Sequence, residues 1–323
     1  MSRCAMGKMR HVLLVLMFVP GIALAESAAG DGSAWLQKIA SAAHLINYSG
    51  TFVYRHDGYM ETSRIFHVSD ANGEHERLEV LDGPPREIIR DNDEVICYMP
   101  EHKAVIVERR KAHKSFPALL PVQLSSINEN YAIRLGSMER VAGYDCQNVM
   151  LEPRDVFRYG HRLCADSASG LLLKASTLNE KNEVVDQFFF TQASIGGNID
   201  PERLKSKYAV KHQLSQQAMD APVDPGWLVK SPPPGFMKIM ALKRSFPGKK
   251  FPTNHLVFSD QLAAVSVFIE PLAGILKPVS GLSSQGAINV YTRPVGEYQV
   301  TVLGEVPAVT VMQIGNSVSL LAK

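Results

Sequence analysis

The cysteines are the residues whose chemistry can be placed most directly from their positions. Cys146 and Cys164 lie in two β-like segments, residues 144–151 and 159–166, on either side of a polar bend. Antiparallel pairing of these segments would place the two thiols opposite each other, and a disulfide closing so short a loop contributes about 3 kcal/mol of stability. The alternative is that all remain buried free thiols, including Cys97 in its apolar strand, and the sequence leaves this choice open.

The sequence carries none of the short motifs that assemble a catalytic site. It has no His-Glu-x-x-His, no Cys-x-x-Cys, no Gly-rich phosphate loop ahead of a lysine and no Gly-x-Ser-x-Gly. The histidines are scattered, and His67 and His75, which flank a predicted turn, are more typical of a surface or half-buried pair than of a metal site. Carboxylates such as Asp57, Glu61 and Asp82 fall in turns, where they hydrogen-bond to the backbone. We therefore expect a binding protein with no metal or other cofactor rather than an enzyme.

The strongest concentration of positive charge is a run of basic residues in the middle of the chain. It consists of Arg109, Arg110 and Lys111, followed by His113 and Lys114. An apolar run with Phe116 comes directly after it, and cations beside apolar side chains suit an amphiphile. The segment is therefore a candidate docking patch for a phosphorylated lipid head group or an acidic peptide. The alternative is a solvated loop or an edge strand protected by its charge.

The first 25 residues have the parts of a secretory signal peptide. A basic start without acidic residues is followed by the apolar run 12–19 and by Ala23-Leu24-Ala25, a small-x-small site ahead of Glu26. As a helix, residues 12–23 would rise about 18 Å, too little for a hydrocarbon core of about 30 Å. We expect cleavage after Ala25 and a mature protein outside the cytoplasm, where disulfides form.

Cleavage also changes the charge of the protein. The full chain has 34 Lys and Arg against 32 Asp and Glu, a formal charge of +2. The signal peptide holds three of the basic residues and no acidic one, so the mature chain would carry −1. A charge so nearly balanced gives no support for a nucleic-acid partner.

The pattern after the first helix, predicted near residues 35–46, is that of an all-β unit. Short segments of alternating apolar and polar residues, separated by turn residues, continue to about residue 195. Consecutive hairpins of this kind build a large antiparallel sheet that curls to bury one face. The polar stretch 201–226 predicts a linker, and residues 227–323 predict a smaller α+β domain that ends in a helix at 308–320.

One side of a curled sheet in residues 26–200 must be buried, and only one or two helices are available to cover it. This predicts an apolar cavity that binds lipid. The candidate lipid-binding residues are Phe52, Tyr54, Phe66, Ile96, Val105, Arg109, Arg110, Lys111, Phe116, Leu119, Leu120, Phe188 and Phe190. Alternation alone does not separate the residues that line the cavity from those that pack behind it.

Several motifs carry a likeness to a known family. In the first unit they are Trp35-Leu36, residues 47–54, Phe116-Pro117, Glu152-Pro153-Arg154-Asp155 and Arg158-Tyr159-Gly160. In the second they are Pro234-Gly235-Phe236, residues 265–270 and residues 300–307. With these motifs the sequence resembles the RseB/MucB family over essentially the whole mature chain. One departure is Cys164, which stands where the family pattern has an aromatic residue.

The resemblance implies a periplasmic negative regulator of the sigma-E-type envelope stress response, a response that includes control of alginate biosynthesis. Such a protein binds the periplasmic domain of a single-pass anti-sigma factor, protects it from site-1 proteolysis, and is released by lipid or lipopolysaccharide. The resemblance also implies an α+β chain with an N-terminal lipoprotein-carrier-like fold, a half-open antiparallel β-barrel with helices around an apolar cavity. The candidate partner-binding residues are Trp227, Phe236, Phe268, Glu270 and Glu305. The oligomeric state is left open, a homo-oligomer included.

Three interpretations compete: a stress-sensing regulator, a plain periplasmic lipid or lipoprotein carrier, and a hydrolase. A hydrolase needs a nucleophile that the motifs do not supply. A simple carrier needs only the first domain, whereas a switch with two sites has a use for the second. The sequence therefore favours the regulator.

Overall fold

The computed structural model describes residues 28–102, 104–109, 115–121, 124–208, 226–244, 251–274 and 278–321. The predicted signal peptide, the basic residues Arg110 and Lys111, the side chain of Arg109 and most of the predicted linker lie outside these ranges. Within them, no helix is both long enough and apolar enough to cross a membrane.

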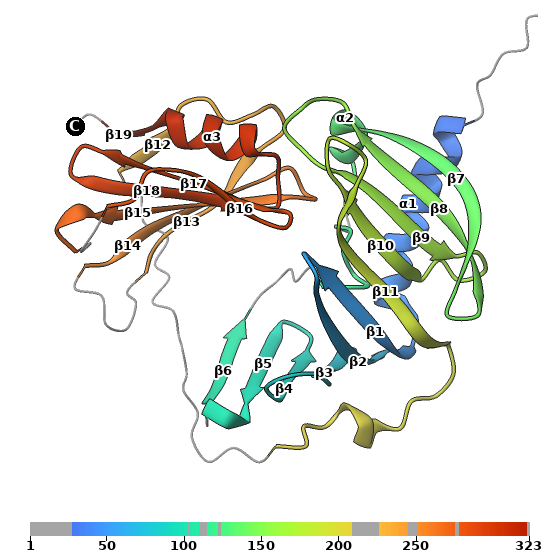
Figure 1. Ribbon diagram of the computed structural model, residues 1–323. Helices are drawn as coiled ribbons and strands as arrows, with labels where there is room; N and C mark the ends of the chain where they lie inside the picture. The colour runs from blue at the N-terminus through green and yellow to red at the C-terminus, as the bar shows by residue number, and fades with distance from the viewer. Residues whose placement is uncertain are drawn as a thin grey trace, which may run out of the picture.

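The first part of the chain forms one antiparallel sheet of eleven strands, in the order β6-β5-β4-β3-β2-β1-β11-β10-β9-β8-β7 (Figure 1). Its strands are β1 (Tyr48–His56), β2 (Tyr59–Asp70), β3 (Gly73–Val80), β4 (Arg86–Asp91), β5 (Glu94–Met99), β6 (Ala104–Arg109), β7 (Tyr131–Val141), β8 (Tyr144–Pro153), β9 (Gly160–Asp166), β10 (Leu172–Leu178) and β11 (Val184–Ile195). Its helices are α1 (Ala28–Leu45) and α2 (Ile127–Asn130), with the short turns η1 (Pro100–His102) and η2 (Pro201–Leu204). Two runs of hairpins, β1 to β6 and β7 to β11, meet where β1 pairs with β11.

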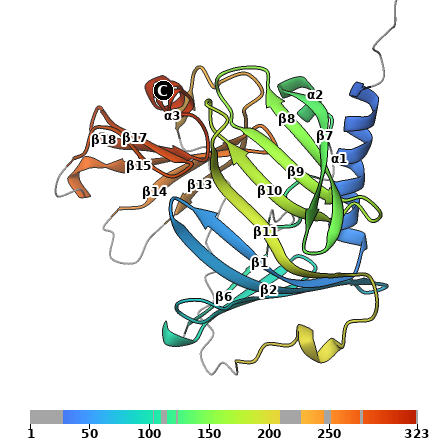
Figure 2. The same cartoon turned by 45° about the vertical axis from the view of Figure 1, so that its right-hand side comes forward.

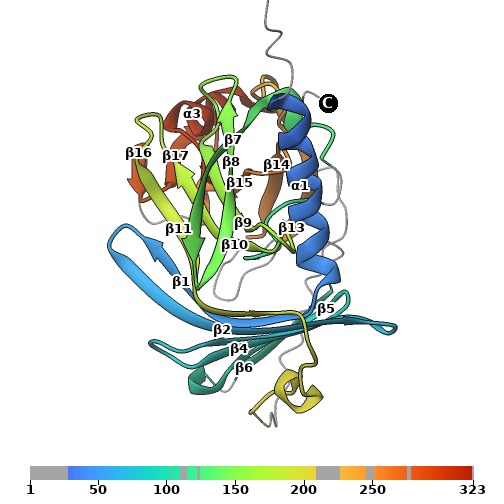
Figure 3. The same ribbon diagram turned by 90° about the vertical axis from the view of Figure 1, so that its right-hand side faces the viewer.

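The sheet bends between these two runs, so that the β7–β11 strands rise away from the β1–β6 strands (Figures 2 and 3). Helix α1 lies within the bend against β7, β8 and β10, with its apolar residues Leu36 and Ile39 buried. The edge strands β6 and β7 do not pair with each other, so the sheet is not closed. This open antiparallel sheet has one inner face, on which the hydrophobic core of the first domain is built.

The last part of the chain builds a second sheet of six strands, in the order β13-β14-β15-β18-β17-β16, beside a two-stranded sheet of β12 and β19. Its elements are β12 (Trp227–Val229), β13 (Met237–Arg244), β14 (Thr253–Ser259), β15 (Ala264–Pro271), η3 (Leu272–Gly274), β16 (Gly281–Gln285), β17 (Ile288–Val295), β18 (Tyr298–Gly304), α3 (Ala308–Ser317) and β19 (Val318–Leu320). Helix α3 covers β17 and β18, and its Val311 and Ile314 are fully buried. This sheet has its own hydrophobic core.

The expected C-terminal helix is three residues too long, because Val318–Leu320 is a strand. Val318 pairs with Val229, and Trp227 pairs with Leu320. The sequence pattern also failed to predict strand β16, because a stretch of Gly, Ser and Gln with one leucine has little β-propensity. It is placed by its partner β17, with Leu282 opposite Tyr291.

The candidate disulfide between Cys146 and Cys164, which the sequence left open, is present, with 5.4 Å between the Cα atoms. The register differs from the expected one: Cys146 lies opposite Asp166, and Cys164 lies opposite Asn148. The two cysteines are therefore diagonal neighbours on β8 and β9 rather than a directly opposed pair. Cys97 takes no part in the bridge.

Candidate functional site

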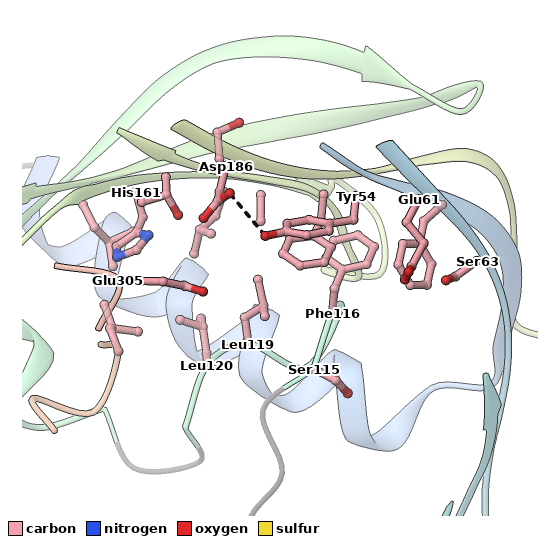
Figure 4. Close-up of a pocket in the computed structure, with 18 of the residues that line it drawn as sticks. Tyr54, Glu61, Ser63, Ser115, Phe116, Leu119, Leu120, His161, Asp186 and Glu305 are labelled. Atoms are coloured by element: carbon pink, nitrogen blue, oxygen red, sulfur yellow. Dashed lines mark hydrogen bonds between the residues drawn. The ribbon is translucent and has the colours of Figure 1, made fainter. Parts of the chain in front are cut away.

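The inner face of the first sheet encloses a cavity of about 430 Å³. Alternate residues of the central strands point into it: Phe52 and Tyr54 of β1, Glu61 and Ser63 of β2, His161 and Leu163 of β9, and Asp186 and Phe188 of β11 (Figure 4). This spacing of two is the pleat of a β-strand, which sends every second side chain to the same face. Pleating, together with the pairing of β1 with β11, thus brings side chains from both runs of strands to one site.

The strand register sorts these side chains into rows that cross the sheet. One row contains Glu61, Tyr54, Phe188, Ala175 and Leu163, each opposite the next on a neighbouring strand. The adjacent row contains His56, Asp186, Thr177, His161 and Leu151. The first row is mostly apolar and the second mostly polar, so the cavity has a polar side beside an apolar wall.

Aromatic rings form the apolar wall. The centroids of Tyr54 and Phe188 are 4.5 Å apart, and those of Phe116 and Phe188 are 5.5 Å apart, both with nearly parallel rings. Phe52 lies 5.1 Å from Phe116, and Phe190 packs behind both. Phe116 belongs to the segment 115–121, whose Leu119 and Leu120 also line the cavity. A wall of this kind suits an acyl chain or another apolar group.

The polar side holds two carboxyl groups and a histidine. Asp186 is buried, hydrogen-bonds to the ring of His56 and accepts a hydrogen bond from the Tyr54 hydroxyl at 3.3 Å. Glu305 is an exposed residue whose side chain points into the cavity at the same end as Asp186 (Figure 4). Burial raises the pKa of Asp186 against the opposing effect of His56. Burial, together with the charge of Asp186, also raises the pKa of Glu305.

The second domain completes the cavity. Leu262, in the turn between β14 and β15, and Glu305, directly after β18, both line it. Gly286, in the turn between β16 and β17, approaches the ring of His56 so closely that a Cβ atom would collide with it, and its φ of +57° also favours glycine. A ligand in the cavity therefore contacts both domains.

Next to the cavity, a buried arginine joins the two domains. Arg158, in the loop between β8 and β9, donates to Asp260 Oδ2 of the second domain at 2.8 Å and to both carboxylate oxygens of Asp155 at 3.0 Å. The guanidinium also donates to the carbonyl oxygen of Pro234 and lies 5.2 Å from the ring centroid of Phe236. The buried guanidinium of Arg158 is thus paired with carboxylates and hydrogen-bonded to a carbonyl oxygen, which offsets the cost of removing its charge from water.

Asp260 is held as completely as Arg158. Besides the bond from Arg158, its Oδ2 accepts a second hydrogen bond, from the Tyr131 hydroxyl at 3.2 Å. Its Oδ1 accepts hydrogen bonds from the backbone N–H groups of Leu262 and Ala263 at 2.9 and 2.7 Å. The turn that carries Asp260 therefore also carries Leu262 into the cavity, so the interdomain ion pair and the cavity share one short segment.

Further contacts surround this junction. Thr310 donates to the carbonyl oxygen of Phe157 at 2.7 Å, and Asn289 donates to the Tyr159 hydroxyl at 3.1 Å. Gly235 has a φ of +78° and lies against Asn130, where any Cβ atom would collide. The motifs that resemble the family, Arg158-Tyr159-Gly160 and Pro234-Gly235-Phe236, thus meet at the domain junction.

The structure separates the predicted lipid-binding residues into groups. Six line the cavity, namely Phe52, Tyr54, Phe116, Leu119, Leu120 and Phe188, and Phe190 packs behind them. Phe66, Ile96 and Val105 do not line it. Arg109, Arg110 and Lys111 lie where no side chain is described.

Phe66, Ile96 and Val105 belong to the outer face of the sheet. Phe66 lies opposite Arg77, and the same row continues through Ile89 to Ile96. The start of the predicted linker covers this face, because Arg203 lies over the Phe66 ring and its carbonyl oxygen accepts a hydrogen bond from Arg77 at 3.0 Å. These residues were assigned to the cavity because alternation does not reveal which face is the inner one.

The predicted partner-binding residues have different surroundings. Trp227 and Phe236 are buried, and Trp227 packs edge-on against Tyr298 in the core of the second domain. Phe268 stacks on His255 with 4.3 Å between ring centroids, and Glu270 accepts a hydrogen bond from Thr253 at 2.9 Å. Glu305 lines the cavity. Of these five residues, Glu305 is the one that lines the cavity, so a ligand there can contact Glu305 and the first domain at the same time.

Sequence reasoning missed His56, Asp186, Leu262, Arg158 and Asp260 as site residues. For Asp186 a signal was present, since it lies two residues before Phe188 on the same strand and must share its face. Arg158 stood within a motif that was already singled out. Leu262 and Asp260 carried no local signal, because their place depends on how the two domains pack.

The fold and the site define a class: a two-domain, β-rich binding protein whose cavity lies at the junction of its domains. Two family models match this chain, the MucB/RseB N-terminal domain over residues 31–208 and the MucB/RseB C-terminal domain over residues 221–319. The chain belongs to the MucB/RseB family. Proteins of this family act as regulators through an anti-sigma factor in the envelope stress response, rather than as a family of enzymes.

Individual members of the family align with this chain over nearly their whole length. The sigma factor AlgU regulatory protein MucB of Pseudomonas aeruginosa is 32% identical over 318 residues, covering 96% of this chain and 98% of the relative. The sigma-E factor regulatory protein RseB of Haemophilus influenzae is 25% identical over 308 residues, covering 94% and 95%.

Solved structures of family members are also similar to this chain over most of its length. The complex of Pseudomonas aeruginosa MucA and MucB superimposes with a TM-score of 0.74 at 30% identity, covering 91% of this chain and 100% of that chain. A crystal structure of MucB gives a TM-score of 0.63 at 28% identity, covering 90% and 98%. The arrangement of this chain is therefore more similar to MucB in the MucA complex.

Proposed function

We propose that this protein is a periplasmic regulator without catalytic activity that binds the periplasmic domain of a transmembrane anti-sigma factor and protects it from site-1 proteolysis. Lipid or lipopolysaccharide releases the anti-sigma factor by inserting an acyl chain into the cavity, while a phosphorylated head group stays outside it. The observation that carries the proposal is the cavity shared between the domains, since Leu262 and Glu305 line it together with the first sheet. Membership of a family whose solved structures include a MucA/MucB complex supplies the class of partner.

The shared turn supports coupling between lipid and partner. A ligand that fills the cavity presses on Leu262, and Asp260 in the same turn holds Arg158 of the first domain. Movement of this turn would alter how the domains meet. A partner lying across both domains would then bind one arrangement better than the other, which is the requirement for a ligand to shift an equilibrium.

A plain lipid or lipoprotein carrier is the second candidate, favoured by the aromatic wall of the cavity. A carrier needs the cavity, but lipid binding in that cavity need not change how the two domains are arranged. Arg109, Arg110 and Lys111 fit either function as proposed contacts for a phosphorylated head group outside the cavity. The two candidates differ in whether lipid changes the affinity for the anti-sigma segment.

Replacing Ala175 by phenylalanine is expected to block the cavity. Ala175 lies between Phe188 and Leu163 in the apolar row, so an added ring fills the space in front of the aromatic wall. We expect the affinity for a neutral apolar probe, N-phenyl-1-naphthylamine, to fall at least about tenfold, or 1.4 kcal/mol. Titration followed by probe fluorescence measures it.

The matched control is Thr191→Phe, which adds the same ring at an exposed position of β11. Its probe affinity should equal that of the unchanged protein. Circular dichroism establishes that Ala175→Phe is folded, since overpacking of this kind costs about 1–3 kcal/mol. Unchanged probe affinity in a folded Ala175→Phe protein would place the lipid site elsewhere.

A further inference from the structure

The charged residues that line the cavity are almost all acidic. Among the described lining residues, Glu61, Asp186 and Glu305 are carboxylic acids, His161 is a histidine, and none is lysine or arginine. Glu61 has a cationic partner, Arg86, at 3.2 Å, and Asp186 has His56. Within the described part of the chain, no ion pair or hydrogen bond to the Glu305 carboxyl is found.

Asp186 and Glu305 come from different domains and point into the same end of the cavity (Figure 4). Asp186 lies close enough to Glu305 for its charge to raise the pKa of the Glu305 carboxyl. Glu305 both lines the cavity and is exposed, so solvent reaches this end of the cavity. A ligand whose apolar part occupies the aromatic wall therefore places its polar end beside two carboxyl groups.

We infer that the cavity selects amphiphiles by head-group charge, taking a cationic amine in preference to a neutral hydroxyl and a hydroxyl in preference to an anionic carboxylate or phosphate. Asp186 and Glu305 are the residues that determine this specificity, and Glu305 is the one contributed by the second domain. The inference rests on the proposed lipid-binding function and names the chemical class that this site accepts.

The physical reason is electrostatic. A negative head group would meet carboxylates of the same charge in a partly desolvated site, where like charges repel far more strongly than in water. An ammonium group meets opposite charge and donates hydrogen bonds, which carboxylates can only accept. His56 pairs with Asp186 and also acts on Glu305 from a distance, but the Glu305 carboxyl has no ion-pair partner of its own among the described residues.

Three amphiphiles with the same twelve-carbon chain test the inference: dodecylamine, dodecanol and dodecanoate. Each displaces N-phenyl-1-naphthylamine from the intact protein at pH 7, below the concentration at which it forms micelles. We expect dodecylamine to bind at least about tenfold more tightly than dodecanoate, with dodecanol between them. Glu305→Gln should reduce the ratio, and Glu305→Lys should reverse the order.

Glu297→Lys is the control, because it makes the same change of charge at an exposed turn of the second domain outside the cavity lining. It should keep the order of the unchanged protein. Equal affinity for all three amphiphiles, or an order that Glu305→Lys leaves intact, overturns the inference while the lipid-binding function stands. Failure of all three to bind removes the proposed lipid-binding function itself, and the inference with it.

Discussion

Replacing Arg158 by methionine is expected to lower the free energy of unfolding by about 3–5 kcal/mol, the usual cost of removing one partner of a buried ion pair. The loss is large because the Asp260 carboxyl is fully buried and would lose its cationic partner. Tyr131 and two backbone N–H groups would still donate to Asp260, but none of them carries charge. Urea unfolding followed by circular dichroism measures the change.

Arg134→Met is the control for loss of an arginine from an ion pair. Arg134 pairs with Glu152 at 3.0 Å, but both side chains are largely exposed, so this change should cost about 1 kcal/mol or less. Changing Asp260 to asparagine together with Arg158→Met should recover part of the loss, because no uncompensated buried charge remains. Equal, small effects at Arg158 and Arg134 would contradict a role for Arg158 in holding the domains together.

The second large effect is expected from the disulfide. Replacing both Cys146 and Cys164 by alanine should lower the free energy of unfolding by about 3 kcal/mol, since the bridge closes a loop of 18 residues in the unfolded chain. Both cysteines are fully buried in the core of the first domain, so the lost sulfur contacts add to the effect. Cys97→Ala is the matched control, and dithiothreitol should destabilise the Cys97→Ala protein but leave the double alanine variant unchanged. Equal stability of the double variant and the control would contradict this account.

The strand pattern predicted much of the fold, because each strand of the first sheet is bounded by turn residues. Strands β7 (Tyr131–Val141) and β11 (Val184–Ile195) both fall within the region of alternating segments that was predicted to end at about residue 195. The pattern placed Phe52, Tyr54 and Phe188 correctly on one face. The pattern could not assign Phe66 to the inner or the outer face of the sheet. A strand carries apolar residues on both faces wherever another segment covers its outer face, and here Arg203 covers Phe66.

The site itself depends on contacts that no local pattern records. Arg158 and Asp260 are separated by 102 positions in the sequence, and Asp186 and Glu305 meet only because the domains pack together. The disulfide shows that a local pattern can also fail to predict the strand register between segments close in sequence. The cysteines were paired correctly, yet their register was displaced, because the β8–β9 pairing is fixed by the whole row of residues rather than by the bend between them.

One short segment, the turn from Asp260 to Ala263, connects the cavity to the domain junction. Asp260 fixes the relation of the domains through Arg158, and Leu262 touches the cavity. Thermodynamic linkage requires that if lipid weakens the binding of the partner, the partner weakens the binding of lipid by the same factor. A carrier without coupling shows neither effect.

The most direct test is the affinity of the intact protein for the periplasmic segment of the anti-sigma factor, measured by calorimetry with and without saturating dodecylamine. We expect the amphiphile to weaken this binding by about 5- to 150-fold, the usual range of coupling between two sites. In Ala175→Phe, whose cavity is filled, the same amphiphile should have no effect, while Thr191→Phe should respond as the unchanged protein does. An affinity for the segment that is the same with the cavity empty and with it saturated would contradict the two-domain switch.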